Sequence, residues 1–338
     1  RSDTVTKPTE GMLEAMFSAK VGDDIFDEDP TVKLLEEKVA GIFGKDAALY
    51  CPSGTMTNQI AIRLHTEPQD QVICDKRSHI YHYEGGGVAY NSLVSVRLVD
   101  GDRGRINANQ IHDNINPDDI HFPKSKLVVL ECTVNRGGGS YYTLPQVEAI
   151  QKAATEHQLL MHLDGARIFN ALAESDEDPK EWGSYFDTIS VCLSKGLGAP
   201  VGSVLTGSQA HITKAKRLRK VLGGAMRQVG YLAAAGIYAL DNHIEILAAD
   251  NHRARQLGEI LVKCPVVDAV DPVDTNIVIF TLKQEVSPSD FVSRMDNLGV
   301  MTLPFGGQMV RMVTHHEITD SMVQYVGDSL NTLFANAN

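Results

Sequence analysis

Short apolar runs alternate with helical patterns along the first two thirds of the chain. Seven of these runs are continuous enough to predict buried strands, at residues 47–52, 71–74, 93–99, 126–133, 159–163, 188–193 and 202–206. Between them, apolar residues recur at helical spacing, as over residues 31–44 and 144–158. Strands that alternate with helices are typical of a doubly wound sheet. We therefore predict an α/β fold with a mainly parallel sheet of seven strands.

The pattern changes near Val266, where a second, smaller group of elements begins. There we expect strands and helices in alternation, at residues 275–282, 289–297, 309–313 and 320–334. The alanine- and leucine-rich stretch 229–264 is too long for one ordinary helix and predicts two. We accordingly expect a large domain, residues 1–240 with an N-terminal arm at 1–20, and a small C-terminal α+β domain, residues 241–338.

Two charged side chains come within two residues of the ends of predicted strands. Asp164 comes after the run 159–163, and Lys195, 31 residues later, comes after the run 188–193. Ligands of open α/β sheets bind beyond the carboxyl ends of the strands. A lysine and an aspartate there suit pyridoxal phosphate, because the amine can form a Schiff base with its aldehyde and the carboxylate can pair with its ring nitrogen. On this pattern alone, a cap at Asp164 and a solvated loop at Lys195 are equally good explanations.

Other stretches have ligand-binding chemistry. The turn 53–55, which contains Gly54, lies between a strand and a helix, where free N–H groups suit a phosphate as well as an ordinary cap. SHIYHYEGGG at 78–87 combines histidines, tyrosines and glycines, which favours a ligand wall. The small residues within 196–202 would leave room for a flat ring. Arg311, inside an apolar strand, predicts a carboxylate partner, with a substrate carboxylate as one candidate.

Composition and charge narrow the function further. The formal net charge of −12 argues against a nucleic acid partner, which requires a basic stripe. Acidic residues are densest in VGDDIFDEDP at 21–30, which we interpret as a solvated turn. The five cysteines have no CxxC spacing, so we expect free thiols in a reducing, cytoplasmic compartment. No apolar run approaches the ~18 residues that a membrane span requires.

Other enzyme classes lack their motifs. No GxGxxG opens a helix after the first strand, which argues against a nicotinamide enzyme. The sequence contains neither HExxH nor GxSxG, which argues against a metal hydrolase and a serine hydrolase, and we predict no metal site. A binding protein that had lost catalysis would be expected to lack a lysine at position 195.

Longer motifs make the chain recognisable. RSDTVTKPT opens it, and other long motifs follow in order: VGDDIFDEDPTV, ALYCPSGTMTNQIA, SHIYHYEGGG, HLDGARIFNA, CLSKGLGAPVGSVL and LGGAMRQVGYLAAAGIYAL. Together, from Arg1 to at least Thr314, they resemble the low-specificity threonine aldolases. The resemblance implies the aspartate aminotransferase fold, which is fold type I of the pyridoxal phosphate enzymes.

The resemblance also implies which residues contact the cofactor. These are Lys195 and Asp164 in the roles given above, His79 stacked on the ring, Gly54 and Thr55 at the phosphate, Arg167, and Arg227 reaching a phosphate from a neighbouring subunit. A shared site implies a homo-oligomer, which we expect to be a homotetramer built as a dimer of dimers.

For the substrate, the resemblance implies a β-hydroxy amino acid such as L-threonine or L-allo-threonine. Its carboxylate would lie against Ser2, Arg167 and Arg311. Lys220 and His121 match residues near its β-hydroxyl group.

The implied reaction is retro-aldol cleavage to glycine and acetaldehyde, catalysed by a carbon–carbon lyase. The β-hydroxyl group must lose its proton, and His79 is the first candidate base, with His121 second. The alternatives are another fold type I lyase, such as an aromatic amino acid β-eliminating lyase, and a non-catalytic homologue that binds pyridoxal phosphate.

Overall fold

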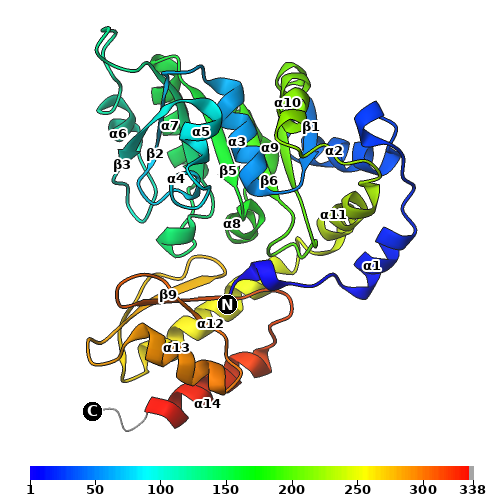
Figure 1. Ribbon diagram of the computed structural model, residues 1–338. Helices are drawn as coiled ribbons and strands as arrows, with labels where there is room; N and C mark the ends of the chain where they lie inside the picture. The colour runs from blue at the N-terminus through cyan, green and yellow to red at the C-terminus, as the bar shows by residue number, and fades with distance from the viewer. Residues whose placement is uncertain (335–338) are drawn as a thin grey trace.

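The computed structural model describes residues 1–334, which contain two sheets. The larger has seven strands in the order β1-β7-β6-β5-β4-β2-β3 (Figure 1). Their bounds are Ala47–Cys51 (β1), Gln71–Asp75 (β2), Ser95–Val99 (β3), Ser125–Glu131 (β4), Leu160–Gly165 (β5), Thr188–Cys192 (β6) and Ser203–Gly207 (β7). Neighbouring strands are parallel except at β7, which is antiparallel to β1 and β6. The predicted sheet of seven mainly parallel strands is confirmed.

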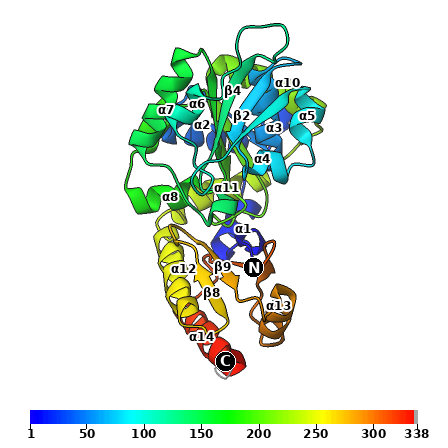
Figure 2. The same ribbon diagram turned by 90° about the vertical axis from the view of Figure 1, so that its left-hand side faces the viewer.

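Helices cover both faces of this sheet, as Figure 2 shows for α7 on one side and α3 and α5 on the other. Their bounds are Glu10–Phe17 (α1), Pro30–Ile42 (α2), Gly54–His65 (α3), His79–His82 (α4), Gly87–Ser92 (α5), Ala108–His112 (α6), Leu144–Glu156 (α7), Ile168–Ser175 (α8), Pro179–Ser184 (α9), Gln209–Val221 (α10) and Gly230–Asn242 (α11). The sequence pattern did not predict α4, α5, α8 and α9, because such short helices show little periodicity.

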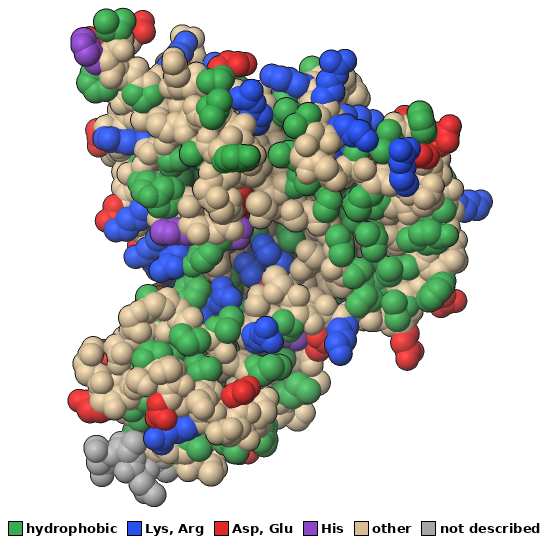
Figure 3. Space-filling model, in the orientation of Figure 1, with side chains coloured by type: hydrophobic (Ala, Val, Ile, Leu, Met, Phe, Trp, Pro, Cys, Tyr) green, Lys and Arg blue, Asp and Glu red, His purple; other side chains and the backbone are tan. Residues whose placement is uncertain are grey.

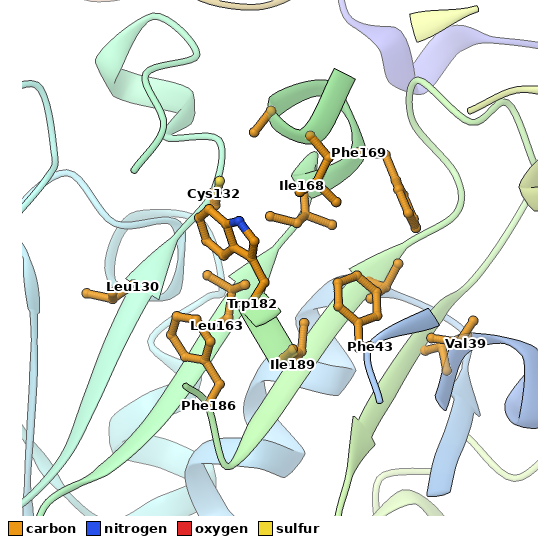
Figure 4. Close-up of a cluster of buried hydrophobic side chains, with 14 of the residues drawn as sticks. Val39, Phe43, Leu130, Cys132, Leu163, Ile168, Phe169, Trp182, Phe186 and Ile189 are labelled. Atoms are coloured by element: carbon orange, nitrogen blue, oxygen red, sulfur yellow. The ribbon is translucent and has the colours of Figure 1, made fainter. Parts of the chain in front are cut away.

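One face of the central strands contributes to a core of large apolar side chains. Leu130, Leu163 and Ile189 project from β4, β5 and β6 into this core (Figure 4). Trp182 and Phe186, from α9 and the loop after it, stack with ring centroids 6.4 Å apart. All five side chains are at most 2% exposed. Burial of each such side chain stabilises the fold by about 1.5–3 kcal/mol, so this core fixes the sheet against α9.

The opposite face of the same strands is polar. His162 and Asp164 alternate with the apolar residues of β5 and lie in register with Thr188 and Ser190 of β6. All four side chains are buried, so they require hydrogen-bond partners. Those partners come from α3, which packs on this face. A sequence pattern that predicted uniformly apolar strands did not reveal this polar face.

The smaller sheet is antiparallel, with the order β10-β11-β9-β8. Its elements are α12 (Leu247–Val262), β8 (Val267–Val270), β9 (Ile277–Leu282), α13 (Pro288–Asn297), β10 (Leu303–Pro304), β11 (Met309–Val313) and α14 (Asp320–Phe334). The short strands β8 and β10 were not predicted. Leu247 belongs to the core of the large sheet and Ala254 to that of the small sheet, so the cores meet along α12. The domain boundary at residues 240–241 stays a prediction.

Side chains hydrogen-bond to backbone groups of the edge strand β1. Glu36 accepts a hydrogen bond from the backbone N–H of Tyr50 at 2.8 Å, and Arg219 donates to the carbonyl oxygen of Tyr50 at 2.7 Å. Arg219 also pairs with Asp24 at 2.7 Å, with both side chains under 10% exposed. The prediction of a solvated acidic turn is therefore wrong at Asp24, because a buried guanidinium requires a carboxylate. It is also wrong at Asp29, which is buried and caps α2.

The sequence also predicted that the chain has no membrane span and that its cysteines are free thiols. Within residues 1–334, no helix is both long enough and apolar enough to cross a membrane. The five cysteines are buried and free, as their spacing predicts.

Candidate active site

The predicted lysine and aspartate lie at the same edge of the large sheet. Asp164 is near the carboxyl end of β5, and Lys195 lies just beyond its neighbour β6. Glu131, the last residue of β4, is directly opposite Asp164 in register. Figure 3 shows a hollow between the two parts of the molecule, where basic and histidine side chains gather. The carboxyl edge therefore collects an amine and two carboxylates.

Glycines shape the loop that carries Lys195. Gly198 has a φ of +80°, and a Cβ atom there would lie 2.8 Å from Cε1 of His316. At Gly202 a Cβ atom would lie 2.4 Å from the hydroxyl oxygen of Tyr50. The expectation that these glycines leave room for a flat ring is wrong, because protein atoms already occupy that space. Their role is to let the loop pack closely.

One amide holds two carboxylates at the site. Asn58, on α3, donates from Nδ2 to Oδ2 of Asp164 and to Oε1 of Glu84, both at 2.9 Å. Gln59 donates to the other oxygen of Glu84 at 2.6 Å. All four side chains are buried. Buried carboxylates are costly without donors, so these amides stabilise an acidic pair that would otherwise repel.

His79 begins α4 beside this acidic pair. Its Nδ1 lies 3.0 Å from Oε1 of Glu84, and because a carboxylate only accepts, Nδ1 donates there. Burial alone would lower the pKa of His79, but the hydrogen bond to Glu84 and the charges of Asp164 and Glu131 outweigh burial and raise it. Glu131 accepts from the backbone N–H groups of His79 and Asn135. The imidazole therefore holds a proton more strongly than a free histidine does.

The ligand atoms of His79, Glu84 and Asp164 lie within 4.8 Å of one another, as in a candidate cation site. However, the amide N–H groups of Asn58 point at both carboxylates. A cation would repel those donors, so the arrangement favours a hydrogen-bonded network.

Gly54 and Thr55 are the first residues of α3, after the cap Ser53. The hydroxyl of Ser203, on β7, is buried and has no hydrogen-bond partner among residues 1–334. Its oxygen is 3.4 Å from the place that a Cβ atom of Gly54 would take. A free hydroxyl beside the N–H groups of a helix N-terminus fits a phosphate group.

The N-terminal arm closes over Arg167. Asp3 accepts two hydrogen bonds from the Arg167 guanidinium, both at 2.6 Å, and one from Asn276, which precedes β9, at 3.2 Å. Burial alone would raise the pKa of Asp3, but Arg167 outweighs it and lowers the pKa to about 2. The expected substrate ligand Arg167 is thus paired within its own chain. Three of its five N–H groups make no hydrogen bond among residues 1–334. Ser2 caps the turn that carries Asp3.

Arg311, on β11, has fewer partners. It donates to the side chain of Asn135, and its guanidinium lies 4.8 Å from the ring centroid of Phe305. Its Nε is buried without a partner within residues 1–334. Burial and the positive charge of Arg167 lower the pKa of Arg311 to about 10. Two guanidinium groups beside one carboxylate, Asp3, leave one positive charge for a bound anion.

Three predicted residues lie outside this cluster in the single chain. His121 precedes the amino end of β4, at the other end of the sheet, where its exposed ring pairs with Asp119 at 2.6 Å. It is therefore not placed to serve as a base in its own chain's site. Lys220 is exposed in the last turn of α10. Arg227 is exposed and pairs with Asp23 at 2.7 Å, so its contact with a neighbouring subunit stays a prediction.

The residues present fit pyridoxal phosphate. Lys195 offers an amine, Asp164 a buried carboxylate, and Ser203 an unpaired hydroxyl at the N-terminus of α3. This donor set matches an aldehyde, a ring nitrogen and a phosphate.

Comparison with known proteins agrees with this donor set. A family model described as beta-eliminating lyase matches residues 1–285. The chain is 40% identical over 341 residues to a probable low-specificity L-threonine aldolase 2 of Arabidopsis thaliana, covering 99% of this chain and 96% of that protein. It belongs to the beta-eliminating lyase family. This lyase is also 38% identical over 321 residues to the low specificity L-threonine aldolase of Escherichia coli (strain K12), with 94% of each chain covered.

Solved structures show the same fold. A threonine aldolase of Leishmania major superposes on this lyase with a TM-score of 0.85 at 20% identity, covering 98% of each chain. The predicted family, fold type I and class of pyridoxal phosphate-dependent lyase are confirmed.

The sequence motifs did not single out every residue of this lyase's site. Asn58, Glu84 and Asp3 each lie inside one of the long motifs, but no residue pattern there indicates their role. For Asp3, the general rule that a buried arginine pairs with a carboxylate predicts a partner for Arg167 but does not say which carboxylate it is. No spacing rule predicts that Asn58 bonds to a carboxylate 106 positions away.

Proposed function

We propose that this lyase cleaves L-threonine and L-allo-threonine to glycine and acetaldehyde, with Lys195 and Asp164 at the centre of its site. The observation that supports this most is the buried, unpartnered Nε–H of Arg311, because Arg311 and Lys195 both interact electrostatically with the same carboxylate, Asp3. Lys195 contributes to lowering the pKa of Asp3, and the charge of Asp3 in turn acts to raise the pKa of Arg311. An amino acid substrate requires a site for its carboxylate near the lysine that holds the cofactor, and Arg311 and Lys195 would provide these two groups.

Pyridoxal phosphate, when bound, supplies a conjugated ring that accepts the electrons of a bond broken at the substrate's Cα. Lys195 would hold the cofactor by its aldehyde carbon. Asp164 would keep a proton on the ring nitrogen, and Asn58 orients that carboxylate. Gly54, Thr55 and the hydroxyl of Ser203 would hold the phosphate.

The arginines decide which substrate bond breaks. Arg311 and the remaining N–H groups of Arg167 would grip the carboxylate as planar donors, with Ser2 beside them. Fixing the carboxylate fixes rotation about the bond between nitrogen and Cα. Only the bond perpendicular to the ring can break, and these contacts would place Cα–Cβ there.

His79 would accept the proton of the β-hydroxyl group through Nε2. Its Nδ1 is committed to Glu84, which holds the ring in one orientation. Because the hydrogen bond to Glu84 also raises the pKa of His79, the enzyme should work best at pH values above that raised pKa, where His79 is neutral.

We also propose a homotetramer in the cytoplasm, where free thiols persist. Figure 3 shows apolar side chains gathered over α1 and α11. Leu13, Phe17, Leu34 and Tyr231 are 41–87% exposed there and on α2, which is typical of an interface. Arg227 would reach a phosphate in the neighbouring subunit.

The test is product release from the enzyme loaded with pyridoxal phosphate. With either L-threonine or L-allo-threonine as substrate, we expect one molecule of acetaldehyde for each molecule of glycine. Lys195→Ala should release neither product. If wild type releases no acetaldehyde but forms ammonia and a keto acid from a β-elimination substrate, the reaction is the alternative one.

A further inference from the structure

A row of buried polar side chains leads from Asp164 into the body of the large sheet. Its members are Asn58 and His65 on α3, His162 on β5 and Thr188 on β6, each at most 4% exposed. Successive polar atoms along the row are 2.9–3.1 Å apart. The roles proposed above use only its first member, Asn58.

The acidic neighbours of Asn58 fix the orientation of its amide. Nδ2 faces carboxylate oxygens of Asp164 and Glu84, which only accept. Oδ1 therefore faces His162, whose Nε2 lies 3.1 Å away. Because an amide oxygen also only accepts, Nε2 of His162 must carry a proton.

The rest of the row follows from the single proton of a neutral ring. Burial lowers the pKa of His162 to about 4, so at neutral pH its one proton is on Nε2. Nδ1 then accepts from the hydroxyl of Thr188 at 2.9 Å. The Thr188 carbonyl oxygen, 3.1 Å from the same nitrogen, only accepts and therefore makes no hydrogen bond to Nδ1 in this tautomer. The Thr188 hydroxyl in turn accepts from Nε2 of His65 at 2.9 Å. The hydrogen bonds of the row therefore all run the same way, from His65 through Thr188, His162 and Asn58 to Asp164.

We propose that His162 is a positioning residue for the cofactor, which holds the Asn58 amide with its N–H groups toward Asp164 and Glu84. Thr188 and His65 fix the tautomer of His162. If the amide turned over, its oxygen would face two carboxylates and repel both. Asp164 would then lose the donor that orients it toward the ring nitrogen. This inference rests on the proposed role of Asp164.

Two substitutions of the same residue separate positioning from packing. In His162→Gln the side-chain amide nitrogen can take the place of Nε2, whereas in His162→Asn the shorter side chain reaches only the place of Nδ1. We expect His162→Gln to bind pyridoxal phosphate within about twofold of wild type and His162→Asn to bind it about tenfold more weakly. The measurement titrates pyridoxal phosphate into enzyme stripped of cofactor and records the visible absorption band, which should shift only in His162→Asn.

A second pair tests the next position along the row. Thr188→Val removes the hydroxyl at nearly constant shape, and Thr188→Ser keeps it. We expect the valine variant to behave as His162→Asn and the serine variant as wild type, which provides the test if the His162 variants do not fold.

Equal cofactor binding in both members of each pair would overturn the inference, as would wild-type binding and spectrum in His162→Asn. The variant Asp164→Ala shows whether it is the proposed role of Asp164 or only the positioning role of His162 that fails. If its spectrum is unchanged, the proposed role of Asp164 is itself wrong. If its spectrum changes while that of His162→Asn does not, only the positioning role fails.

Discussion

At the scale of single residues, the charge of His79 depends on the carboxylate that it touches. A base must be neutral to accept a proton, so activity should fall as the pH falls through the pKa of His79. Because Glu84 contributes to raising that pKa, Glu84→Gln should lower it and move the acidic limb of the kcat/KM profile to lower pH. Profiles with L-threonine, with the exposed Glu67→Gln as control, measure this shift. An acidic limb that stays in place in Glu84→Gln would argue against His79 as the base.

The Arg311 guanidinium should matter for its shape as well as its charge. Lysine keeps the charge but cannot offer two parallel N–H groups, so Arg311→Lys should lower kcat/KM for L-threonine at least about tenfold, mainly through KM. Binding of pyridoxal phosphate should be unchanged, because Arg311 is assigned to the substrate. Steady-state kinetics and a cofactor titration check both statements. If the variant instead loses its affinity for pyridoxal phosphate, Arg311 contributes to cofactor binding and its assignment to the substrate is wrong.

The sequence could identify residues at this scale when their chemistry was local. Lys195 and Asp164 lie within two residues of the ends of apolar runs, and this placement predicted their meeting at one sheet edge. The partner of Arg167 could not be identified, because Asp3 lies 164 positions away and reaches it only through the docking of the arm. The position of His121 was not predictable either, since a motif match does not say at which end of a strand the residue lies, and its role stays a prediction.

At the scale of elements, the N-terminal arm depends on one buried ion pair. Asp3→Ala leaves Arg167 as a buried cation without its anion, which should destabilise the fold by about 3–5 kcal/mol. The contribution of Asp3 is fully present above its unfolded pKa of about 4 and is lost as the pH falls toward 2, because its folded pKa is the lower one. Urea unfolding at neutral pH measures it.

The exposed pair of Lys38 and Asp241 provides the matched control for the arm. Asp241→Ala should cost less than about 1 kcal/mol, because water solvates both partners. Similar losses in Asp3→Ala and Asp241→Ala would mean that the arm contributes little.

Elements were predictable where periodicity was long enough to be read. The strands of the large sheet and the long helices α2 and α7 match their predicted positions within a few residues. The reversed direction of β7 was not predictable, because an apolar run has the same pattern in either direction. The polar face of β5 and β6 was hidden for a related reason, since buried polar residues interrupt an apolar run only slightly.

At the scale of the whole molecule, a site shared between subunits allows complementation. If Arg227 reaches a neighbour's phosphate, Lys195→Ala and Arg227→Ala chains assembled together form one complete site per mixed pair. We expect co-expression of these two variants to restore part of the activity that each lacks or has lost. Lys195→Ala with Asp164→Ala should restore none, because both residues belong to the same chain's site. No recovery in the first mixture would confine Arg227 to its own subunit.

The measurement that tests the site most directly is chemical trapping of the cofactor. Borohydride reduction of the enzyme with pyridoxal phosphate fixes the cofactor to the amine that holds it, and peptide mass spectrometry locates the label. We expect the label on Lys195 and its loss in Lys195→Ala. A label on another lysine, with Lys195 unmodified in the wild-type enzyme, would contradict the site described above.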